Sequence, residues 1–416
     1  MSRPKRVHVV GAGLAGLAAA VRLADAGVRI VLHEAARQAG GRCRSYDDAT
    51  LGCRIDNGNH LLIAGNHAAM AYLRQIGALE TLVGPDEPAY PFIDLTTGER
   101  WTVRPNLGRV PWWLFQPARR VAGTGVADYL RALRLMTARP EHVVADVLDR
   151  ETTIFRRLWQ PLAVAALNTE VEQGAAILLS RVLRESFGAG GNACRPLVPR
   201  EGLSESLIDP ALAYLARHGA ELRFGDRLRG VEVDDGALHA LAFDAGSEAV
   251  AAEEAVVLAV TAPVAARLLP DLLAPDEFRG IVNAHFRTTA PATMPLFIGV
   301  IGGTVEWVFR KRDVLSVTIS AADRFMDMSA DELAARLWPE VRRAYDLPEM
   351  PLPPWQVVKE RRATFAATPA QIARRPKAAT LWANLVLAGD WTDTGLPATI
   401  EGAIRSGFAA AERLLR

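Results

Sequence analysis

The chain begins with a short strand, a glycine-rich turn and a helix, and this unit constrains the fold more than any other feature of the 416 residues. Residues 6–10 are mostly β-branched, which predicts a buried parallel strand. Residues 14–26 have helical character and end at Gly27, and residues 28–33 predict a second strand. Strand, helix and strand in this order predict an α/β fold with a Rossmann-like domain.

Three glycines, Gly11, Gly13 and Gly16, connect the first strand to the helix with the spacing GxGxxG. The first permits a tight turn, the second lets the backbone approach a pyrophosphate, and the third allows helix and strand to pack closely. The helix then presents free N–H groups and the positive end of its dipole to the phosphates. Glu34 ends the second strand 18 residues after Gly16, where a carboxylate can accept from a ribose hydroxyl. Together these features predict a dinucleotide site.

Two further segments carry groups suited to the same cofactor. Arg42 follows a glycine pair and could make a bidentate contact with a phosphate, although a surface ion pair is the competing role. Near the C-terminus, residues 384–388 predict a strand that delivers Gly389 and Asp390 to a loop. A helix begins near Thr399, and its N-terminus could stabilise negative charge on a reduced flavin ring.

Composition excludes several classes of protein. The 48 basic and 47 acidic residues give a net charge of +1, so no overall field attracts nucleic acid. No run of 18 apolar residues is present, so we expect no transmembrane helix. Cys43, Cys53 and Cys194 form no CxxC pair, and the histidines lack the spacing of metal ligands. We therefore expect a reducing compartment, no disulfide framework and no metal site.

Longer segments resemble a known family. EAARQAGGR and AGDWTDTGLPATIEGA are similar to the flavin amine oxidase and phytoene desaturase superfamily, whose members bind FAD. A narrower resemblance is to the hydroxysqualene dehydroxylases, also called squalene-associated FAD-dependent desaturases. It is carried by DNGNHLLIAGN, LWQPLAVAALNTEVEQGAAILLSRVLRESFG, LVPREGLSESLIDPALAYLARHGAELRFG and GDWTDTGLPATIEGAIRSG. These blocks extend nearly from end to end and are much more specific than GxGxxG alone.

The resemblance implies a discontinuous FAD-binding domain of the glutathione-reductase type, with an inserted α+β domain that binds the substrate. Strand signals that return after residue 221, and the last strand and helix, assign the FAD-binding domain to residues 1–65, 195–270 and 376–416. The substrate-binding domain is then made of residues 66–194 and 271–375. Helical stretches interrupted by prolines are expected to dominate the first of these two segments.

The resemblance also implies which residues line FAD. They are Gly11, Gly13, Gly16, Glu34, Ala35, Arg42, Gly58, Val231, Thr261, Gly389, Asp390, Thr399 and Ile400. Val231 is expected to offer its backbone to the adenine and Thr261 to approach the adenosine, whereas the last four face the ribityl chain and the isoalloxazine. Because the C-terminal block contains no cysteine, we expect FAD to be bound non-covalently.

The reaction implied by the resemblance removes the hydroxyl group of hydroxysqualene, a long-chain isoprenoid, and gives squalene for hopanoid or terpenoid biosynthesis. Acid-assisted departure of the hydroxyl would leave an allylic or cyclopropylcarbinyl-like cation, to which N5 of the reduced flavin would deliver a hydride. The electron donor stays open, since no second GxGxxG indicates an NAD(P)H domain. The alternatives are a carotenoid or phytoene-type desaturase, a flavin amine oxidase, and a non-catalytic FAD- or lipid-binding partner of terpenoid synthases.

Four residues in the matching blocks are candidates for the chemistry. His60 follows a turn that runs close to the flavin in the superfamily, and it could donate to the leaving hydroxyl, or only fix the turn or contact FAD. Asp393 and Glu401 flank the flavin-facing loop, and either could be the acid if burial raises its pKa. For Glu401 the competing role is stabilisation of a helix N-terminus. Trp159 could stabilise a cation through its ring or simply lie in the core.

Residues 104–139 hold seven arginines and a single acid, Asp128, around the apolar run VPWWLF. Neighbouring tryptophans among arginines suit a membrane interface, where indoles lie at headgroup depth and arginine pairs with phosphate. A buried insert or a lid over a substrate tunnel is the alternative. A long-chain hydrocarbon substrate dissolves in lipid, so we expect a cytoplasmic protein that associates peripherally with the inner face of the cell membrane.

Overall fold

The computed structural model describes residues 3–234 and 236–416. Five parallel strands form the first of two large sheets, in the order β10-β2-β1-β14-β20. They come from three distant parts of the chain: β1 (Arg6–Val10), β2 (Arg29–Glu34), β10 (Glu221–Phe224), β14 (Glu254–Leu258) and β20 (Leu385–Leu387). The predicted strand–helix–strand unit is confirmed, because β1 and β2 pair in parallel and α1 (Leu14–Asp25) connects them.

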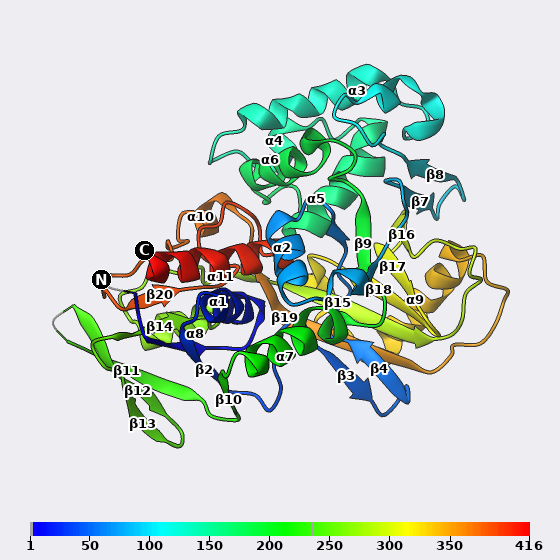
Figure 1. The fold of residues 1–416 in the computed structure, drawn as a ribbon. Helices are drawn as coiled ribbons and strands as arrows, with labels where there is room; N and C mark the ends of the chain where they lie inside the picture. Colours follow the sequence, from blue (N-terminus) through cyan, green and yellow to red (C-terminus); the bar gives the residue numbers. More distant parts are fainter. Residues whose placement is uncertain (1–2, 235) are drawn as a thin grey trace.

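Helices cover one face of this parallel sheet, and a small antiparallel sheet covers the other (Figure 1). The helices are α1, α2 (His67–Gln75), α7 (Asp209–Arg217) and α11 (Ile400–Leu415). The opposite face carries α8 (Ala262–Leu268) with β11 (Leu228–Asp234), β12 (Ala237–Phe243) and β13 (Gly246–Ala249). This layered arrangement buries both faces of the sheet, which explains the nearly continuous apolar character of its strands.

Small residues let α1 and α11 approach each other closely. Gly407 of α11 faces α1, and a Cβ at this position would lie 2.2 Å from the carbonyl oxygen of Ala15. The close contact brings the C-terminal helix beside the glycine-rich turn, although the two lie at opposite ends of the sequence.

A seven-stranded sheet forms the second half of the molecule, in the order β19-β15-β18-β17-β16-β7-β8. Its neighbouring strands are antiparallel except for β16 and β7, which are parallel. The strands are β7 (Tyr90–Asp94), β8 (Arg100–Val103), β15 (Phe278–Arg287), β16 (Phe297–Ile301), β17 (Trp307–Lys311), β18 (Val314–Ile319) and β19 (Trp355–Phe365).

Helical elements dominate residues 66–194 as expected, but strands β7 and β8 in this segment were not predicted. Their sequences, YPFID and RWTV, contain aromatic and β-branched residues, which fit a half-buried sheet. The partner of β7 is β16, which lies far away in the sequence, so local helical signals could not reveal the pairing.

Helix α9 (Ala330–Ala344) covers one face of the second sheet, and a lobe of short helices covers the other (Figure 1). We call this part the helical lobe; its elements are η2 (Trp112–Phe115), η3 (Pro117–Arg119), α3 (Val126–Arg131), η4 (Ala132–Thr137), α4 (Val144–Val147), η5 (Phe155–Trp159), α5 (Gln160–Leu167), α6 (Ala176–Glu185) and η6 (Phe187–Ala189). Within residues 3–234 and 236–416, no helix is both long and apolar enough to cross a bilayer.

Short elements connect the two large sheets. They are β3 (Ser45–Asp48), β4 (Cys53–Asp56), β5 (Leu62–Ile63), η1 (Leu79–Thr81), β6 (Leu82–Val83), β9 (Pro196–Pro199), η7 (Ser204–Ile208), η8 (Ala322–Phe325) and α10 (Pro369–Ile372). The loop between β4 and β5 holds the predicted flavin-facing turn and lies against the seven-stranded sheet.

Candidate active site

The glycine-rich turn forms a strip of bare backbone at the carboxyl end of β1. A Cβ at Gly13 would meet no other atom within 4 Å, so the space in front of this residue is open. Gly40 forms an isolated bridge with Gly13 and donates its N–H to the carbonyl oxygen of Ala12 at 2.8 Å. The two glycine segments that the sequence linked to phosphate binding therefore lie side by side.

The other two glycines of the motif are enclosed. A Cβ at Gly11 would lie 2.4 Å from the carbonyl oxygen of Ala259, and a Cβ at Gly16 would lie 1.9 Å from that of Gly11. Gly11 also has φ +106°, a conformation that favours glycine. These contacts correspond to the turn and packing roles predicted from the motif.

The carboxylate of Glu34 organises this turn. Its two oxygens accept hydrogen bonds from the N–H groups of Ala12 and Ala36, both at 2.8 Å. The turn before β11 is bound beside it, because Gly225 and Asp226 donate to the carbonyl oxygens of Ala36 and Glu34 at 3.0 and 3.3 Å. Charge-assisted bonds of this kind hold a carboxylate firmly, so Glu34 is fixed at the edge of the turn.

Three other residues, Val231, Thr261 and Ala35, are predicted to contact adenosine. The side chain of Val231 packs in the apolar cluster on the far face of the parallel sheet, and the backbone bound to Glu34 belongs to residues 225–226 instead. Thr261 begins α8 and is exposed, two residues after the Ala259 carbonyl that abuts the turn. Ala35 is exposed directly after β2. Contact of these three residues with adenosine stays a prediction.

Arg42 and Asp390 bind each other. Nη2 of Arg42 donates to both carboxylate oxygens of Asp390 at 2.8 Å, and Nη1 donates to the carbonyl oxygen of Ala363 at 2.5 Å. The carboxylate of Asp390, which is buried, raises the pKa of Arg42. The pair joins the second glycine segment to the C-terminal block, a contact that the sequence did not predict.

The C-terminal loop is held by a buried arginine that sequence reasoning missed. Arg375 donates to the carbonyl oxygens of Leu396 at 2.7 Å and of Asp390 at 3.1 Å, and to the hydroxyl of Thr394 at 3.1 Å. Burial lowers the pKa of Arg375 to about 10. No local motif marks this residue, because its partners follow it by 15 to 21 positions.

The rest of the C-terminal block forms a capped helix start. Thr399 caps α11 by accepting from the N–H of Gly402 at 3.0 Å, and Ile400 is buried against the parallel sheet. A Cβ at Gly389 would lie 2.3 Å from the indole of Trp391, so this position requires glycine for space. The helix N-terminus predicted near Thr399 is confirmed, whereas the contact of these residues with a flavin stays a prediction.

The turn before His60 is fixed to the seven-stranded sheet by buried amides. Nδ2 of Asn283 donates to the carbonyl oxygen of Asn57 at 3.3 Å, and Nδ2 of Asn59 donates to Oγ1 of Thr318 at 3.1 Å. Thr318 donates in turn to Oδ1 of Asn283 at 2.8 Å. A Cβ at Gly58 would lie 3.1 Å from Nδ2 of Asn283, so glycine lets the turn approach the sheet.

His60 lies directly after this turn in a poorly hydrated position. Burial lowers the pKa of His60 to about 4, and the positive charges of Lys311 and Arg42 lower it further against the attraction of Asp56. The imidazole is therefore neutral at pH 7. A neutral ring can donate an N–H hydrogen bond, but it lacks the dissociable extra proton of an imidazolium, and the role of His60 stays a prediction.

Neither Asp393 nor Glu401, the two carboxylates predicted as possible acids, lies in an environment that suits a proton donor. Asp393 is exposed, so it does not lie in the buried environment that the prediction required. Glu401 is buried, and its oxygens accept from the N–H groups of Ala68 and Ala69 at 3.0 and 2.9 Å. It also accepts from Arg405 at 3.0 Å. Glu401 thus stabilises a helix N-terminus, as the competing role stated, but that of α2 rather than of its own helix.

A row of facing residues crosses the seven-stranded sheet from the turn toward the helical lobe. Asn283 pairs with Thr318, Thr318 with Trp307, Trp307 with Gly299, and Gly299 with Phe92. Residues that are directly opposite on adjacent strands point to the same face. A Cβ at Gly299 would lie 2.4 Å from the ring of Phe92, so glycine makes room for the aromatic rings. The row is polar at the turn and aromatic farther away.

Trp159, in η5 of the helical lobe, lies in the apolar core that the lobe forms with this row. Its ring makes an edge contact with Tyr129, with centroids 6.1 Å apart, and Tyr129 makes another with Trp113 at 5.2 Å. All three rings are buried. The structure therefore supports the core role for Trp159, and it places Trp113 in the core as well.

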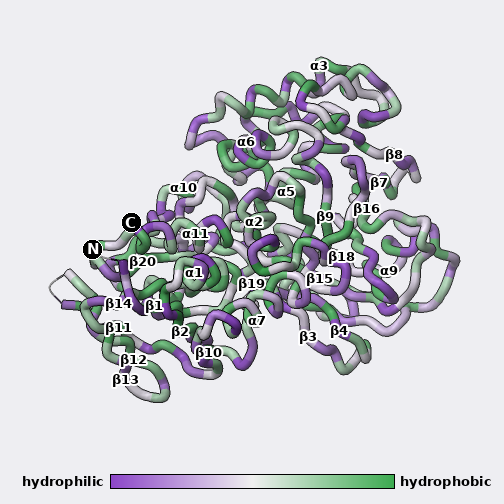
Figure 2. The backbone as a smooth tube through the Cα atoms, viewed as in Figure 1, coloured by the Kyte–Doolittle hydropathy of each residue, from purple (hydrophilic) through white to green (hydrophobic). Residues whose placement is uncertain are grey.

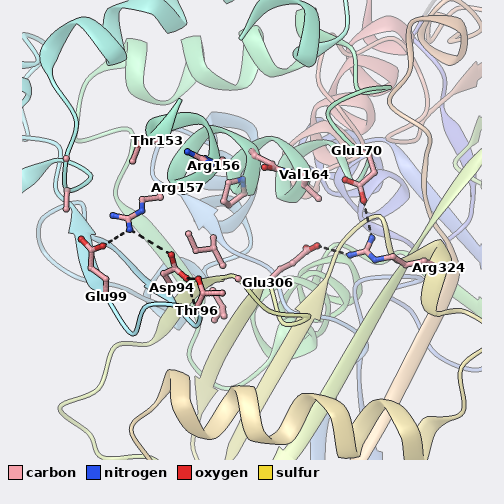
Figure 3. Close-up of a pocket in the computed structure, with 17 residues that line it drawn as sticks. Asp94, Thr96, Glu99, Thr153, Arg156, Arg157, Val164, Glu170, Glu306 and Arg324 are labelled. Atoms are coloured by element: carbon pink, nitrogen blue, oxygen red, sulfur yellow. Dashed lines mark hydrogen bonds and ion pairs between the residues drawn. The ribbon is translucent and has the colours of Figure 1, made fainter. Parts of the chain in front are cut away.

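A cavity of about 800 Å³ opens beside the far end of β16 (Figure 3). Figure 3 shows Arg157 with Glu99 and Asp94 on one side, and Arg324 with Glu170 and Glu306 on the other. The walls therefore carry several charged groups.

Glu306 lines this cavity and immediately precedes Trp307 of the aromatic row. Burial raises the pKa of Glu306 to about 7, although its bond from the N–H of Ser320 at 2.7 Å and the nearby Arg324 oppose the shift. Glu306 thus has a pKa close to neutral pH, the property that the sequence analysis expected of an acid at Asp393 or Glu401. Sequence reasoning missed it because nothing in the local sequence GGTVEW signals burial.

Within residues 3–234 and 236–416, one group of possible metal ligands comes together that the sequence did not group: His8, His33 and Glu248. Nδ1 of His8 lies 3.2 Å from Nε2 of His33, and the carboxylate oxygens of Glu248 lie 3.9 Å from both. The imidazole rings differ by only 22° in tilt and their centroids are 5.5 Å apart, so the facing nitrogens lie nearly in line between them. An N–H···N hydrogen bond between neutral imidazoles accounts for this arrangement.

Comparison with known proteins identifies the family. A model of the flavin containing amine oxidoreductases matches residues 14–415. A hydroxysqualene dehydroxylase of Rhodopseudomonas palustris is 51% identical over 414 residues, covering 99% of this chain and 98% of that protein. One from Sinorhizobium fredii is 47% identical over 412 residues, covering 99% of each. The chain belongs to the hydroxysqualene dehydroxylase family.

The similarities of this chain to proteins with other names are weaker or cover less of the chain. A probable zeta-carotene desaturase of Synechococcus elongatus is 26% identical over 99% of the chain. An L-amino-acid oxidase of Notechis scutatus scutatus is 37% identical, but over only 26% of the chain. The structure of a putative protoporphyrinogen oxidase from Exiguobacterium has a TM-score of 0.67 at 19% identity and covers 99% of both chains, so the fold is shared.

The cofactor of the family, FAD, fits the residues of the glycine-rich turn. The open space at Gly13 leaves room for a pyrophosphate against backbone N–H groups and the N-terminus of α1. Glu34 is held where a ribose hydroxyl can donate to it. In this hydroxysqualene dehydroxylase family member, the Arg42–Asp390 pair lies between that turn and the C-terminal helix.

Glu34→Gln is expected to weaken FAD binding by about 10- to 100-fold. The amide NH₂ would face the N–H of Ala12 or Ala36, which leaves two donors opposed and removes one acceptor for the ribose. Titration of apoprotein with FAD, followed by flavin fluorescence, measures the change. The control is Glu253→Gln. Glu253 is exposed and directly precedes β14 of the same parallel sheet, so this variant should bind FAD as the wild type does. Equal affinity in both variants would mean that the ribose is held elsewhere.

Glu401→Gln should lower the free energy of unfolding by about 1–2 kcal/mol, because an amide cannot accept from Ala68 and Ala69 as a carboxylate does. Urea unfolding measures this loss, and Glu412→Gln, an exposed position on the same helix, is the control. Turnover per bound flavin should be preserved. A stable variant with turnover reduced about 100-fold would instead identify Glu401 as a proton donor.

Proposed function

We propose that this protein removes the hydroxyl group of hydroxysqualene reductively and releases squalene. The near-full-length similarity to hydroxysqualene dehydroxylases carries this proposal, because it includes the substrate-binding half as well as the FAD-binding half. The similarity to an L-amino-acid oxidase is confined to about a quarter of the chain, and that to a desaturase is half as strong in identity. These two activities are therefore less well supported.

The reaction is a net two-electron reduction. The C–O bond breaks, a C–H bond forms at the same carbon, and the hydroxyl leaves as water, so one hydride and one proton are consumed for each molecule of product. Reduced FAD supplies the hydride when it is bound. The protein must then bind the carbon chain, keep water from the developing cation and provide the proton.

The aromatic row supports the first two tasks. Trp307 and Phe92 lie on the sheet face that begins at the buried turn carrying Asn57. Their rings are buried, and they pack with the apolar inner side of the helical lobe. Apolar walls exclude water, and an aromatic face can stabilise a cation by about 0.5–2 kcal/mol.

Glu306 is our proposed proton donor. It lines the cavity and immediately precedes Trp307, and a carboxyl with a pKa of about 7 is protonated in a large fraction of molecules at neutral pH. Its bond from the N–H of Ser320 orients one oxygen and leaves the other near Arg324. His60 is neutral and Asp393 is exposed, so neither offers a comparable proton.

The direction of electron flow tests the proposed reaction. Photoreduced enzyme mixed anaerobically with hydroxysqualene should regain its oxidised flavin absorbance as squalene appears, with one flavin oxidised per product. Oxidised enzyme should not convert hydroxysqualene. Gas chromatography of the product and stopped-flow absorbance measure the two quantities. If oxidised enzyme is instead bleached by a polyene or by an amine, the protein is a desaturase or an amine oxidase.

Glu306→Gln tests the proton donor through pH dependence. In the wild type, the folded-state pKa of about 7 lies above the ordinary value of 4.5, so the stability contribution of Glu306 is complete below about pH 4.5 and is lost as the pH rises through 7. The variant should lack this loss, a difference on the order of 1–3 kcal/mol in unfolding free energy between acidic and alkaline buffers. Its kcat should be about 100-fold lower and should lose the decline above neutral pH.

Glu99→Gln is the matched control, since Glu99 lines the same cavity but is partly exposed and paired with Arg157. It should retain the wild-type pH profile of both stability and kcat. A Glu306→Gln enzyme with normal kcat at every pH would exclude Glu306 as the donor while leaving the proposed reaction intact.

A further inference from the structure

We propose that the outer side of the helical lobe, formed by residues 104–139, docks on the surface of an anionic lipid bilayer. We call this side the docking surface. The proposal concerns where the protein binds and does not depend on the reaction it catalyses, because it rests on exposure and charge alone.

Exposed apolar side chains are concentrated in this segment. Of the 11 large hydrophobic residues that are exposed among those the structure describes, six lie within residues 104–139. Phe115 is 73% exposed, Leu133 60% and Trp112 44%. The other three are Leu107, Val110 and Leu130. A soluble surface rarely gathers so many apolar residues in one short segment, so this region is suited to an apolar partner.

The helices of the segment are apolar on two sides. In η2, Trp113 and Leu114 point into the core, while Trp112 and Phe115 on either side of them are exposed. In α3 and η4, the side chains of Tyr129, Ala132 and Leu135 are buried. The residues directly after the first two, Leu130 and Leu133, are exposed. One apolar side is enough to pack a helix onto a core, so the second is left for another contact.

The exposed sides of η2 and α3 belong to one lobe. Tyr129 of α3 packs edge-on against Trp113 of η2, and its hydroxyl accepts from the N–H of Val121 at 2.8 Å. Hydrophobic and hydrophilic residues alternate along the backbone of this lobe in Figure 2. The sequence prediction of membrane contact is thereby corrected for Trp113, which serves the core, and kept for Trp112.

The charge of the segment selects an anionic partner. Seven arginines and one acid give residues 104–139 a charge of +6, whereas the whole chain carries +1. The single acid, Asp128, is already engaged with Arg131 at 3.0 Å and with the N–H of Gly125 at 2.8 Å. Arg109, Arg134 and Arg139 are exposed and have no carboxylate partner among the described residues.

A lipid surface matches these features better than a second copy of the chain does. Two copies meeting through this surface would bring +6 against +6, which repels. A bilayer offers acyl chains to Phe115 and Leu133, headgroup depth to Trp112, and phosphates to the arginines. The guanidinium of Arg119 over the ring of Trp112, at 5.1 Å, joins the two kinds of group in one place.

Sedimentation with vesicles tests the docking surface in the FAD-bound protein. Vesicles of phosphatidylcholine and phosphatidylglycerol in equal parts should carry the protein down, and vesicles of phosphatidylcholine alone should carry down much less. Each arginine near an anionic surface contributes about fivefold to partitioning, so Arg109→Gln, Arg134→Gln and Arg139→Gln together should lower it by roughly 100-fold. The control combines Arg29→Gln, Arg267→Gln and Arg413→Gln, which removes the same charge from exposed positions elsewhere.

The apolar contribution needs its own variant. Trp112→Ser, Phe115→Ser and Leu133→Ser together should lower partitioning by at least about tenfold, with Trp113 left in place to preserve the core. The control combines Leu273→Ser, Leu352→Ser and Leu381→Ser, which removes three exposed leucines outside the segment. Both variants should retain bound FAD and the wild-type melting temperature.

Hydrogen exchange of the unmodified protein gives an independent reading if a variant folds poorly. Anionic vesicles should slow exchange within residues 104–139 and leave the parallel sheet unchanged. Protection elsewhere, equal binding to both kinds of vesicle, or equal losses in the test and control variants would overturn the proposal. Absence of vesicle binding together with self-association that Phe115→Ser abolishes would also overturn it, in favour of an interface between copies.

Discussion

An ion pair between a partly exposed guanidinium and a buried carboxylate joins distant segments on the cofactor side of this molecule. Arg42 and Asp390 are separated by 348 positions, and Arg42 also reaches the backbone of Ala363 in β19. Removal of Arg42 would leave the buried carboxylate of Asp390 without its charged partner, which destabilises the folded state. The pair connects the second glycine segment, the C-terminal block and the last strand of the second sheet.

A second joint connects the turn at residues 56–60 to the seven-stranded sheet through buried amides and an ion pair between Asp56 and Lys311 of β17. Amide side chains such as Asn283 satisfy the backbone of the turn without adding charge. The sheet continues from this joint as a row that is first polar and then aromatic. The same face of the sheet therefore presents amide and hydroxyl groups near the turn and apolar rings farther from it.

Three glutamates show how environment divides the roles of one residue type. Glu34 accepts from two backbone N–H groups beside the glycine turn, and Glu401 does the same for the start of α2. Glu306 has a single backbone donor and a distant arginine, so burial dominates and raises its pKa to about 7. The three carboxylates therefore differ in the number of backbone donors, which is two for Glu34 and Glu401 and one for Glu306.

The sequence by itself determined the parts of this protein that depend on neighbouring residues. The parallel strands, the GxGxxG turn, Glu34 and the capped start of α11 were predictable, because turn geometry and apolar periodicity are local properties. The family blocks extended this to the cofactor. Only the tertiary structure decided that β7 and β8 join the second sheet, that Glu401 caps α2, that Asp393 is exposed and that Trp113 is buried while Trp112 is not. Burial, pKa and pairing depend on segments far apart in the chain, and no local pattern encodes them.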